Sequence, residues 1–310
     1  MARRVTVTGA TGLIGVALIE ALQRRGAEVT ILSRDAGRAR KRLRDAGLQP
    51  VEAFDWNLLA EPAPKEALDG RDAIVHLAGE NVAQRWSADA KRSIRESRVT
   101  GTRNLLAGCA QARRRPRALI SSSAIGYYGA HGEEPLDEDA PPGASFLAEV
   151  CVEWEAEATK ATELGARVVL VRTGVVLHKD GGALAKMLPP FRLGVGGPVA
   201  GGRQFISWIH RADVTGMYVA ALEDERWSGP VNATAPDPVS NADFSQTLGR
   251  VLHRPALLPV PGAALRLLYG EMAEIVTDGA RVLPAKPLVL GYEFAHPRLE
   301  QALSSALGRG

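Results

Sequence analysis

The sequence predicts an α/β protein with a doubly wound parallel sheet and a smaller α+β unit at its C-terminal end. Short β-branched segments alternate with helical ones, which is typical of βαβ units. A glycine-rich turn follows the first of these segments, and the alternation stops after Ala221. A chain of 310 residues is long enough for one large unit and a smaller one.

The predicted elements follow in chain order. Six segments have the length and composition of buried strands, namely residues 3–8, 28–33, 49–54, 73–76, 118–121 and 167–172. Residues 13–25, 87–111 and 146–163 have the apolar spacing of helices. A short strand at 231–233, a helix near Asn241 and a proline-rich stretch follow. We therefore expect a dinucleotide-binding domain at 1–224 and a substrate domain at 225–310, interleaved with the loop 183–210.

Composition excludes several classes of protein. The chain is 45% hydrophobic and 24% charged, as globular domains are, and no apolar run approaches the ~20 residues of a membrane helix. The first residues do not resemble a signal peptide, so we expect a cytoplasmic protein. Cys109 and Cys151 form no disulfide or metal-ligand pattern, and no metal site is expected. The basic run 113–117 is interpreted as a solvated helix end, so nucleic acid is not an expected partner, and the lack of a long apolar run means that no membrane partner is expected either.

The strongest chemical signal is the loop Gly9-Ala10-Thr11-Gly12-Leu13-Ile14-Gly15. It follows a strand and opens a helix. Gly9 permits the sharp turn, Gly12 lets the backbone approach a pyrophosphate, and Gly15 lets the helix pack closely on the strand. The helix N-terminus suits an anion there. This loop predicts a dinucleotide site of the Rossmann type.

The end of the second strand indicates which dinucleotide is bound. An NAD enzyme usually places Asp or Glu there, whereas this chain has Ser33-Arg34. An arginine and a serine can bind a ribose 2′-phosphate, which a carboxylate would repel. We therefore predict NADP(H), with two alternatives left open: Arg34 is only a solvated side chain, or Asp35 turns inward.

Further motifs resemble the extended short-chain dehydrogenase/reductase superfamily. They are GxxGxxG at 9–15, His76-Leu77-Ala78-Gly79, Ser121-Ser122-Ser123 and Trp208-Ile209-His210-Arg211-Ala212-Asp213-Val214. Leu77-Ala78-Gly79-Glu80-Asn81, Ser97-Arg98, Tyr127-Tyr128-Gly129, Phe146-Leu147-Ala148-Glu149, Trp154-Glu155 and Pro190-Phe191-Arg192-Leu193-Gly194 are similar to its atypical epimerase family branch, described as nucleoside-diphosphate-sugar epimerase-like, which also carries a small C-terminal domain. The resemblance implies further cofactor contacts from Leu77, Ala78, Gly79, Arg98 and Val176, beside Thr11, Leu13 and Ile14 in the loop. Ordinary strand-end packing is the alternative for Leu77, Ala78 and Val176, and a solvated helix charge is the alternative for Arg98.

The catalytic pattern of that superfamily is missing. Its members carry Tyr-x-x-x-Lys on a helix, with the tyrosine as general acid or base. Aligning Glu155 with the glutamate that follows the lysine puts Leu147 at the tyrosine position and Cys151 at the lysine position. Cys151 lies among apolar residues and is interpreted as a core residue.

Other residues must then supply any proton. The resemblance implies a catalytic role for Ser123, which matches the active-site serine of the superfamily, although it could instead only bond the backbone at the strand end. We also predict a catalytic role for Tyr127 or Tyr128, which follow it on a glycine-flanked loop, with packing as the alternative for at least one tyrosine. The glycine-rich loop 192–205 suggests a substrate lip. Its candidate substrate-binding residues are Arg192, Arg203 and Gln204, together with His210, for which an anchoring role is also open.

These observations predict an NADP(H)-binding, epimerase-like oxidoreductase that acts on a carbonyl/alcohol centre of a small molecule, a sugar nucleotide being one candidate. The missing Tyr/Lys pair leaves a second hypothesis, a redox sensor or regulatory protein that binds NADP(H) without turnover. The protein is expected to be a monomer or a homodimer.

Overall fold

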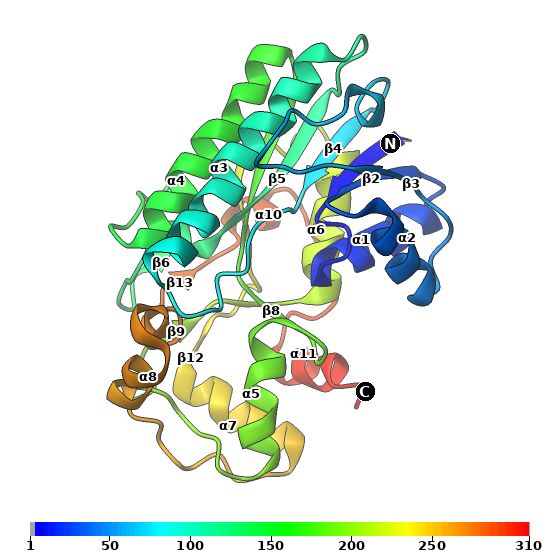
Figure 1. The fold of residues 1–310 in the computed structure, drawn as a ribbon. Coiled ribbons are helices and arrows are strands. Elements are labelled where there is room, and N and C mark those ends of the chain that lie inside the picture. The colour runs from blue at the N-terminus through cyan, green and yellow to red at the C-terminus, as the bar shows by residue number, and fades with distance from the viewer. Residues whose placement is uncertain (1–3, 310) are drawn as a thin grey trace.

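The computed structural model describes residues 4–309 and is built around a seven-stranded parallel sheet (Figure 1). The strands lie in the order β11 (Gly229–Ala233), β7 (Arg167–Thr173), β5 (Ala118–Ala124), β4 (Ala73–His76), β1 (Arg4–Thr8), β2 (Glu28–Ser33) and β3 (Glu52–Asp55). The expected doubly wound α/β fold is confirmed. Arg3, with which the first strand was expected to begin, lies outside the described residues.

Helices cover both faces of this sheet (Figure 1). α1 (Leu13–Arg24), α2 (Ala36–Asp45) and α6 (Arg211–Glu223) pack on one face, and α3 (Ala88–Gln111) and α4 (Phe146–Thr159) pack on the other. The central strands are buried on both sides, so they read as nearly continuous apolar runs rather than as alternating ones. Because all seven strands run parallel, their carboxyl ends meet at one edge of the sheet, where ligands of such sheets bind.

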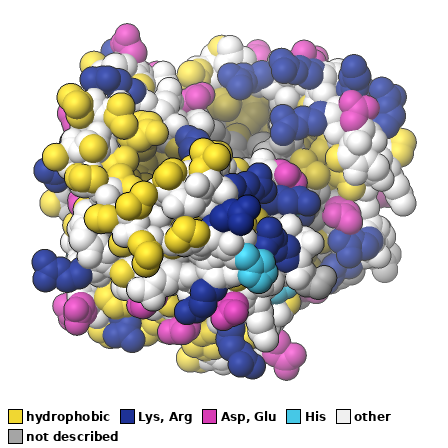
Figure 2. All heavy atoms as spheres, turned by 90° about the horizontal axis from the view of Figure 1, so that it is seen from below, with side chains coloured by type: hydrophobic (Ala, Val, Ile, Leu, Met, Phe, Trp, Pro, Cys, Tyr) yellow, Lys and Arg dark blue, Asp and Glu magenta, His cyan; other side chains and the backbone are white. Residues whose placement is uncertain are grey.

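A second hydrophobic core lies beyond that edge, in the lower part of Figure 1. It is formed by β8 (Val175–Leu177), α5 (Gly182–Arg192), β10 (Trp208–His210), α7 (Asn241–Leu252) and α11 (Leu299–Ala306). The remaining elements are the pairs β6 (Pro135–Leu136) with β13 (Arg281–Val282) and β9 (Phe205–Ile206) with β12 (Val239–Ser240), the helices α8 (Gly262–Tyr269), α9 (Glu274–Thr277) and α10 (Ala285–Val289), and the 3-10 turns η1 (Lys65–Ala67), η2 (Ile125–Tyr128), η3 (Lys160–Leu164) and η4 (Gly270–Ala273). Seen from below in Figure 2, the molecule shows hydrophobic side chains gathered over one side of its surface.

β11 follows residue 224, at which the first domain is expected to end. It pairs in parallel with β7 from Gly229↔Val169 to Ala233↔Thr173. The large sheet therefore continues to Ala233. The participation of the segment 183–210 in the second unit is visible in α5, whose Leu184 and Leu188 pack in the second core.

Among residues 4–309, no helix is both long enough and apolar enough to cross a membrane.

Candidate cofactor and active site

The glycine loop has the close backbone packing that its sequence predicts. Gly9 adopts φ +65°, and a Cβ there would lie 2.7 Å from the Leu77 carbonyl carbon. A Cβ on Gly15 would lie 2.4 Å from the Gly9 oxygen, so both positions require glycine. Gly12 is the N-cap of α1 and provides no side-chain cap. The N-terminus of α1 is thus open at the carboxyl edge of the sheet, which is the arrangement that binds a pyrophosphate.

A chain of buried hydrogen bonds braces the neighbouring strand end. Thr8 Oγ1 accepts the Leu77 and Ala78 amides at 3.1 Å each and lies 2.7 Å from His76 Nδ1. His76 Nε2 lies 3.1 Å from Thr102 Oγ1, which donates to the Arg98 carbonyl. These bonds assign the ring proton to Nε2, because Thr102 has no other proton to give. Burial, with a smaller contribution from Arg98, lowers the pKa of His76 to about 4, so the imidazole is neutral.

The end of β2 presents the predicted 2′-phosphate residues. Arg34 is exposed and has no hydrogen bond or ion pair among the described residues. Asp35 does not turn inward, because its Oδ1 accepts the Arg38 amide at 2.7 Å and caps α2. The backbone N–H of Asp35 lies 3.4 Å from Ser33 Oγ, which is a weak contact. The alternative in which Asp35 faces the ribose is therefore not supported.

The further cofactor contacts that the family resemblance implies lie beside the glycine loop. The Arg98 guanidinium donates to the Glu80 and Ile94 carbonyls, and a Cβ on Gly79 would lie 3.2 Å from it. Val176 is partly buried near the glycine loop, because the Gly181 and Gly182 segment that follows it packs on Leu13. Burial lowers the pKa of Arg98 below its usual value, although nearby Cys151 and Glu80 oppose the shift.

Ser123 lies in a buried network that the sequence did not predict. Its hydroxyl donates to Glu155 Oε1 at 2.6 Å. Arg172 binds both oxygens of Glu155, with Nε 2.9 Å from Oε1 and Nη2 2.8 Å from Oε2. Burial opposes the charge of Arg172, but its hydrogen bonds with Glu155 raise the pKa of the guanidinium above its usual value. Glu155 is 7% exposed and Arg172 is 3% exposed, so the pair is desolvated.

The two candidate tyrosines occupy different environments. Tyr128 is fully buried, and its hydroxyl bonds Arg172 Nη1, Asn232 Oδ1 and the Asp137 carbonyl. Burial raises the pKa of Tyr128 to about 12. Tyr127 is only partly buried, its ring lies 3.5 Å from the Arg172 guanidinium carbon, and its hydroxyl has no hydrogen bond among the described residues. The structure thus leaves Tyr127 as the one with a free phenol.

The positions of the missing Tyr/Lys pair are apolar. Leu147 packs with Phe146, Trp86 and Met272 in a hydrophobic cluster where the two units meet. Cys151 is 4% exposed, and its Sγ lies 3.8 Å from the Ala124 carbonyl. Burial raises the pKa of Cys151 to about 11, so the thiol is not activated. This agrees with its interpretation as a core residue.

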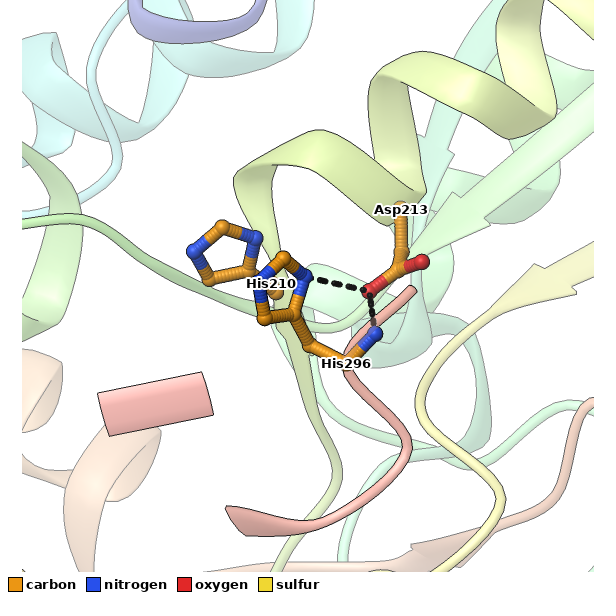
Figure 3. A group of neighbouring side chains, drawn as sticks. All are labelled: His210, Asp213 and His296. Carbon is orange, nitrogen blue, oxygen red and sulfur yellow. Dashed lines mark hydrogen bonds and ion pairs between the residues drawn. The ribbon is translucent and has the colours of Figure 1, made fainter. Parts of the chain in front are cut away.

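His210 anchors rather than catalyses in this geometry (Figure 3). Its Nδ1 accepts the Ala212 amide at 3.2 Å and caps α6, and its ring stacks on His296 with centroids 3.8 Å apart. Asp213 accepts the Ala295 and His296 amides at 2.7 and 3.1 Å, which fastens the segment before α11 to the first turn of α6. Burial lowers the pKa of His210 to about 4.

The same three residues are close enough to suggest a cation site, since one ligand atom from each lies within 4.8 Å of the others. Two features argue against it. The lone pair of His210 Nδ1 already caps the helix, and a helix N-terminus carries positive potential that disfavours a cation. The contact between Asp213 and His296 was not predicted from the sequence, because the two positions are 83 residues apart in the chain.

The expected substrate lip is divided between exposed and structural residues. Arg192 and Arg203 are exposed. The Nε2 of Gln204 is used within the fold, because it donates to the Val199 and Val276 carbonyls at 3.0 Å each. The cofactor candidates, Ser123 and Tyr127 lie at the carboxyl edge of the large sheet, and Tyr128 and His210 make hydrogen bonds within the fold.

An open helix N-terminus, a glycine cradle and a parallel sheet define a dinucleotide-binding α/β protein. Residues 5–233 match the NAD dependent epimerase/dehydratase family, and residues 260–306 match a domain of unknown function, DUF1731. The chain therefore belongs to the NAD dependent epimerase/dehydratase family.

Relatives extend over nearly the whole chain. The chain is 40% identical over 306 residues to the chloroplastic epimerase family protein SDR39U1 homolog of Arabidopsis thaliana, covering 98% of this chain and 86% of the relative. A crystal structure of human epimerase family protein SDR39U1 (isoform 2) with NADPH matches with a TM-score of 0.86 and 34% identity, over 99% of this chain and 100% of the human one. A UDP-glucuronic acid 4-epimerase from Bacillus cereus, 18% identical with a TM-score of 0.79 over 99% of this chain and 98% of its own, shares the fold.

Proposed function

We propose that the protein is an NADP(H)-dependent oxidoreductase that acts on a carbonyl/alcohol centre of a small metabolite. The observation that carries this proposal is the end of β2, where Arg34 is exposed and unpaired while Asp35 is committed to capping α2. That arrangement offers a cation and no carboxylate to a ribose 2′-phosphate. The NADPH held by the human relative supports the same preference.

The glycine loop and the neighbouring strand end fit such a cofactor. The open N-terminus of α1 would hold the pyrophosphate, and the Leu77 and Ala78 backbone, fixed by Thr8, would lie against the nucleotide. When bound, NADPH supplies a hydride. The protein must then supply a proton and a holding site for the substrate.

Tyr127 is the proposed proton donor. Its hydroxyl is free, it lies in the turn that follows Ser123, and the Arg172 guanidinium holds its ring. A protonated phenol suits the donation of a proton to a substrate carbonyl, whereas the removal of a proton from an alcohol needs a phenolate. The reaction is therefore proposed to favour reduction.

Ser123 is proposed to hold the substrate as a hydrogen-bond acceptor. Its single proton is donated to Glu155, so only its oxygen lone pairs remain for a ligand. It can accept a hydrogen bond from a substrate hydroxyl, but it cannot donate one to a carbonyl without breaking the bond to Glu155. We therefore propose that the substrate carries a hydroxyl group, and a sugar nucleotide is one such candidate.

The test is NADPH oxidation by the purified full-length protein, measured at 340 nm against hydroxylated aldehydes, ketones and UDP-4-keto sugars. We expect substrate-dependent oxidation by at least one hydroxylated carbonyl compound. Tight NADPH binding with no turnover by any of them would contradict the oxidoreductase proposal and favour the redox-sensor hypothesis.

A further inference from the structure

One surface of the C-terminal unit exposes large hydrophobic side chains. We call it the leucine face, and its members are Leu193 and Val195 after α5, Leu257 and Leu258 before α8, Leu267, Leu268 and Tyr269 in α8, and Ile275 and Val276 in α9. Leu193, Leu257 and Leu267 are 78, 79 and 80% exposed. Single exposed leucines are ordinary, but a cluster of this kind marks an interaction surface.

The segments that carry the leucine face lie against one another. Arg254 Nε donates to the Arg192 carbonyl at 3.1 Å, and Val199 and Val260 form a parallel bridge. The loop after α5 therefore lies alongside the segment that leads into α8. α8 contains no buried residue, so the packing of the fold does not require its two adjacent leucines.

Most of the charges next to this surface are basic, although the exposed carboxylates Glu274 and Asp278 lie at its α9 end. Arg192 and Arg266 are exposed and have no carboxylate partner among the described residues, and the Arg254 side chain bonds only carbonyl oxygens. Glu271, the first acidic residue after α8, is already paired with Lys91. Figure 2 shows Lys and Arg side chains beside the hydrophobic ones on the lower face of the molecule.

We propose that the leucine face binds the surface of an anionic lipid bilayer. Apolar side chains flanked by unpaired arginines suit an interface in which leucines enter the acyl boundary and guanidinium groups meet headgroup phosphates. A second copy of this chain fits less well, because a two-fold interface would bring together the arginines of both copies, which outnumber the carboxylates of Glu274 and Asp278. The expectation that no membrane is a partner rested on hydropathy runs, which detect spanning segments and not a surface assembled from separate loops.

The test is co-sedimentation of the full-length protein with vesicles of phosphatidylcholine alone or with about 30% phosphatidylglycerol. We expect binding to the anionic vesicles at least about tenfold stronger than to the neutral ones, and weaker in high salt, since each interfacial arginine contributes roughly fivefold. The double variant Leu267→Asp/Leu268→Asp should lose on the order of tenfold or more of this binding.

The matched control is Leu288→Asp/Val289→Asp in α10, an adjacent pair that is 50 and 85% exposed and lies outside the leucine face. The control should bind vesicles like the unmodified protein, and both variants should keep its NADPH affinity and circular dichroism. Equal binding by the two double variants, or no preference for phosphatidylglycerol, would overturn the proposal. Self-association in light scattering that only Leu267→Asp/Leu268→Asp abolishes, without vesicle binding, would instead assign the face to a second copy.

Discussion

The Ser123 hydroxyl donates its proton to Glu155 across 2.6 Å, and this bond sets what each residue can do. An ion pair with Arg172 requires Glu155 to be a carboxylate, which has no proton to return. Ser123 can therefore only accept a further hydrogen bond. The same carboxylate holds Arg172, whose guanidinium in turn supports both candidate tyrosines.

Breaking this pair should cost stability. Glu155→Gln leaves the buried charge of Arg172 without its carboxylate partner, so we expect the free energy of unfolding to fall by about 3 kcal/mol. Glu157→Gln is the matched control, because Glu157 is equally buried in the same helix but pairs with Arg103 and Lys160, which reach solvent. The control should cost about 1 kcal/mol or less. Urea unfolding measures both, and equal losses would contradict the role of the pair.

The two tyrosines should separate activity from stability. Tyr127→Phe removes a free hydroxyl, so we expect a 10²- to 10⁴-fold lower single-turnover rate of NADPH oxidation, the usual range for a lost general acid, with unchanged unfolding. Tyr128→Phe removes the buried hydroxyl that bonds Arg172 Nη1 and Asn232 Oδ1, and it should lower the unfolding free energy by about 1–3 kcal/mol. If Tyr127→Phe keeps the full rate, the proton donor is another group.

Stability should fall in mild acid because of His76. Its pKa is about 4 in the folded protein and 6.5 as the unperturbed value, so between these pH values the unfolded chain binds a proton that the folded one does not. The contribution is fully present above pH 6.5 and is lost as the pH falls to 4, amounting to about 3 kcal/mol. His76→Gln should flatten the difference in unfolding free energy between pH 7 and pH 4.5. An unchanged slope would show that the ring titrates normally.

The elements that the sequence predicted correctly are those determined by neighbouring residues. The glycine loop, the strand ends and the start of α3 at the Ser87 cap follow from residues that lie next to one another. The pairing of β11 with β7 could not be predicted, because strand pairing depends on the whole sheet and a five-residue strand after a turn carries no mark of its partner.

The site shows the same limit. Glu155 was noticed only as an alignment marker, although a glutamate on an apolar helix is a signal of a buried charge that needs a partner. Its partners Ser123 and Arg172 come from two other elements and could not be found by spacing. The two adjacent tyrosines are equivalent in sequence, and only the packing of Tyr128 against Asn232 distinguishes them.

The central claim is that this edge of the sheet binds NADP(H), and calorimetric titration with NADPH and NADH tests it most directly. We expect NADPH to bind roughly tenfold or more tightly, because one charge-assisted phosphate contact contributes about 1.5–3 kcal/mol. Arg34→Asp should remove or reverse this preference. Arg40→Asp, which changes an exposed arginine in the helix α2 that follows, should keep it. Equal affinities of the unmodified protein for NADPH and NADH would contradict the account.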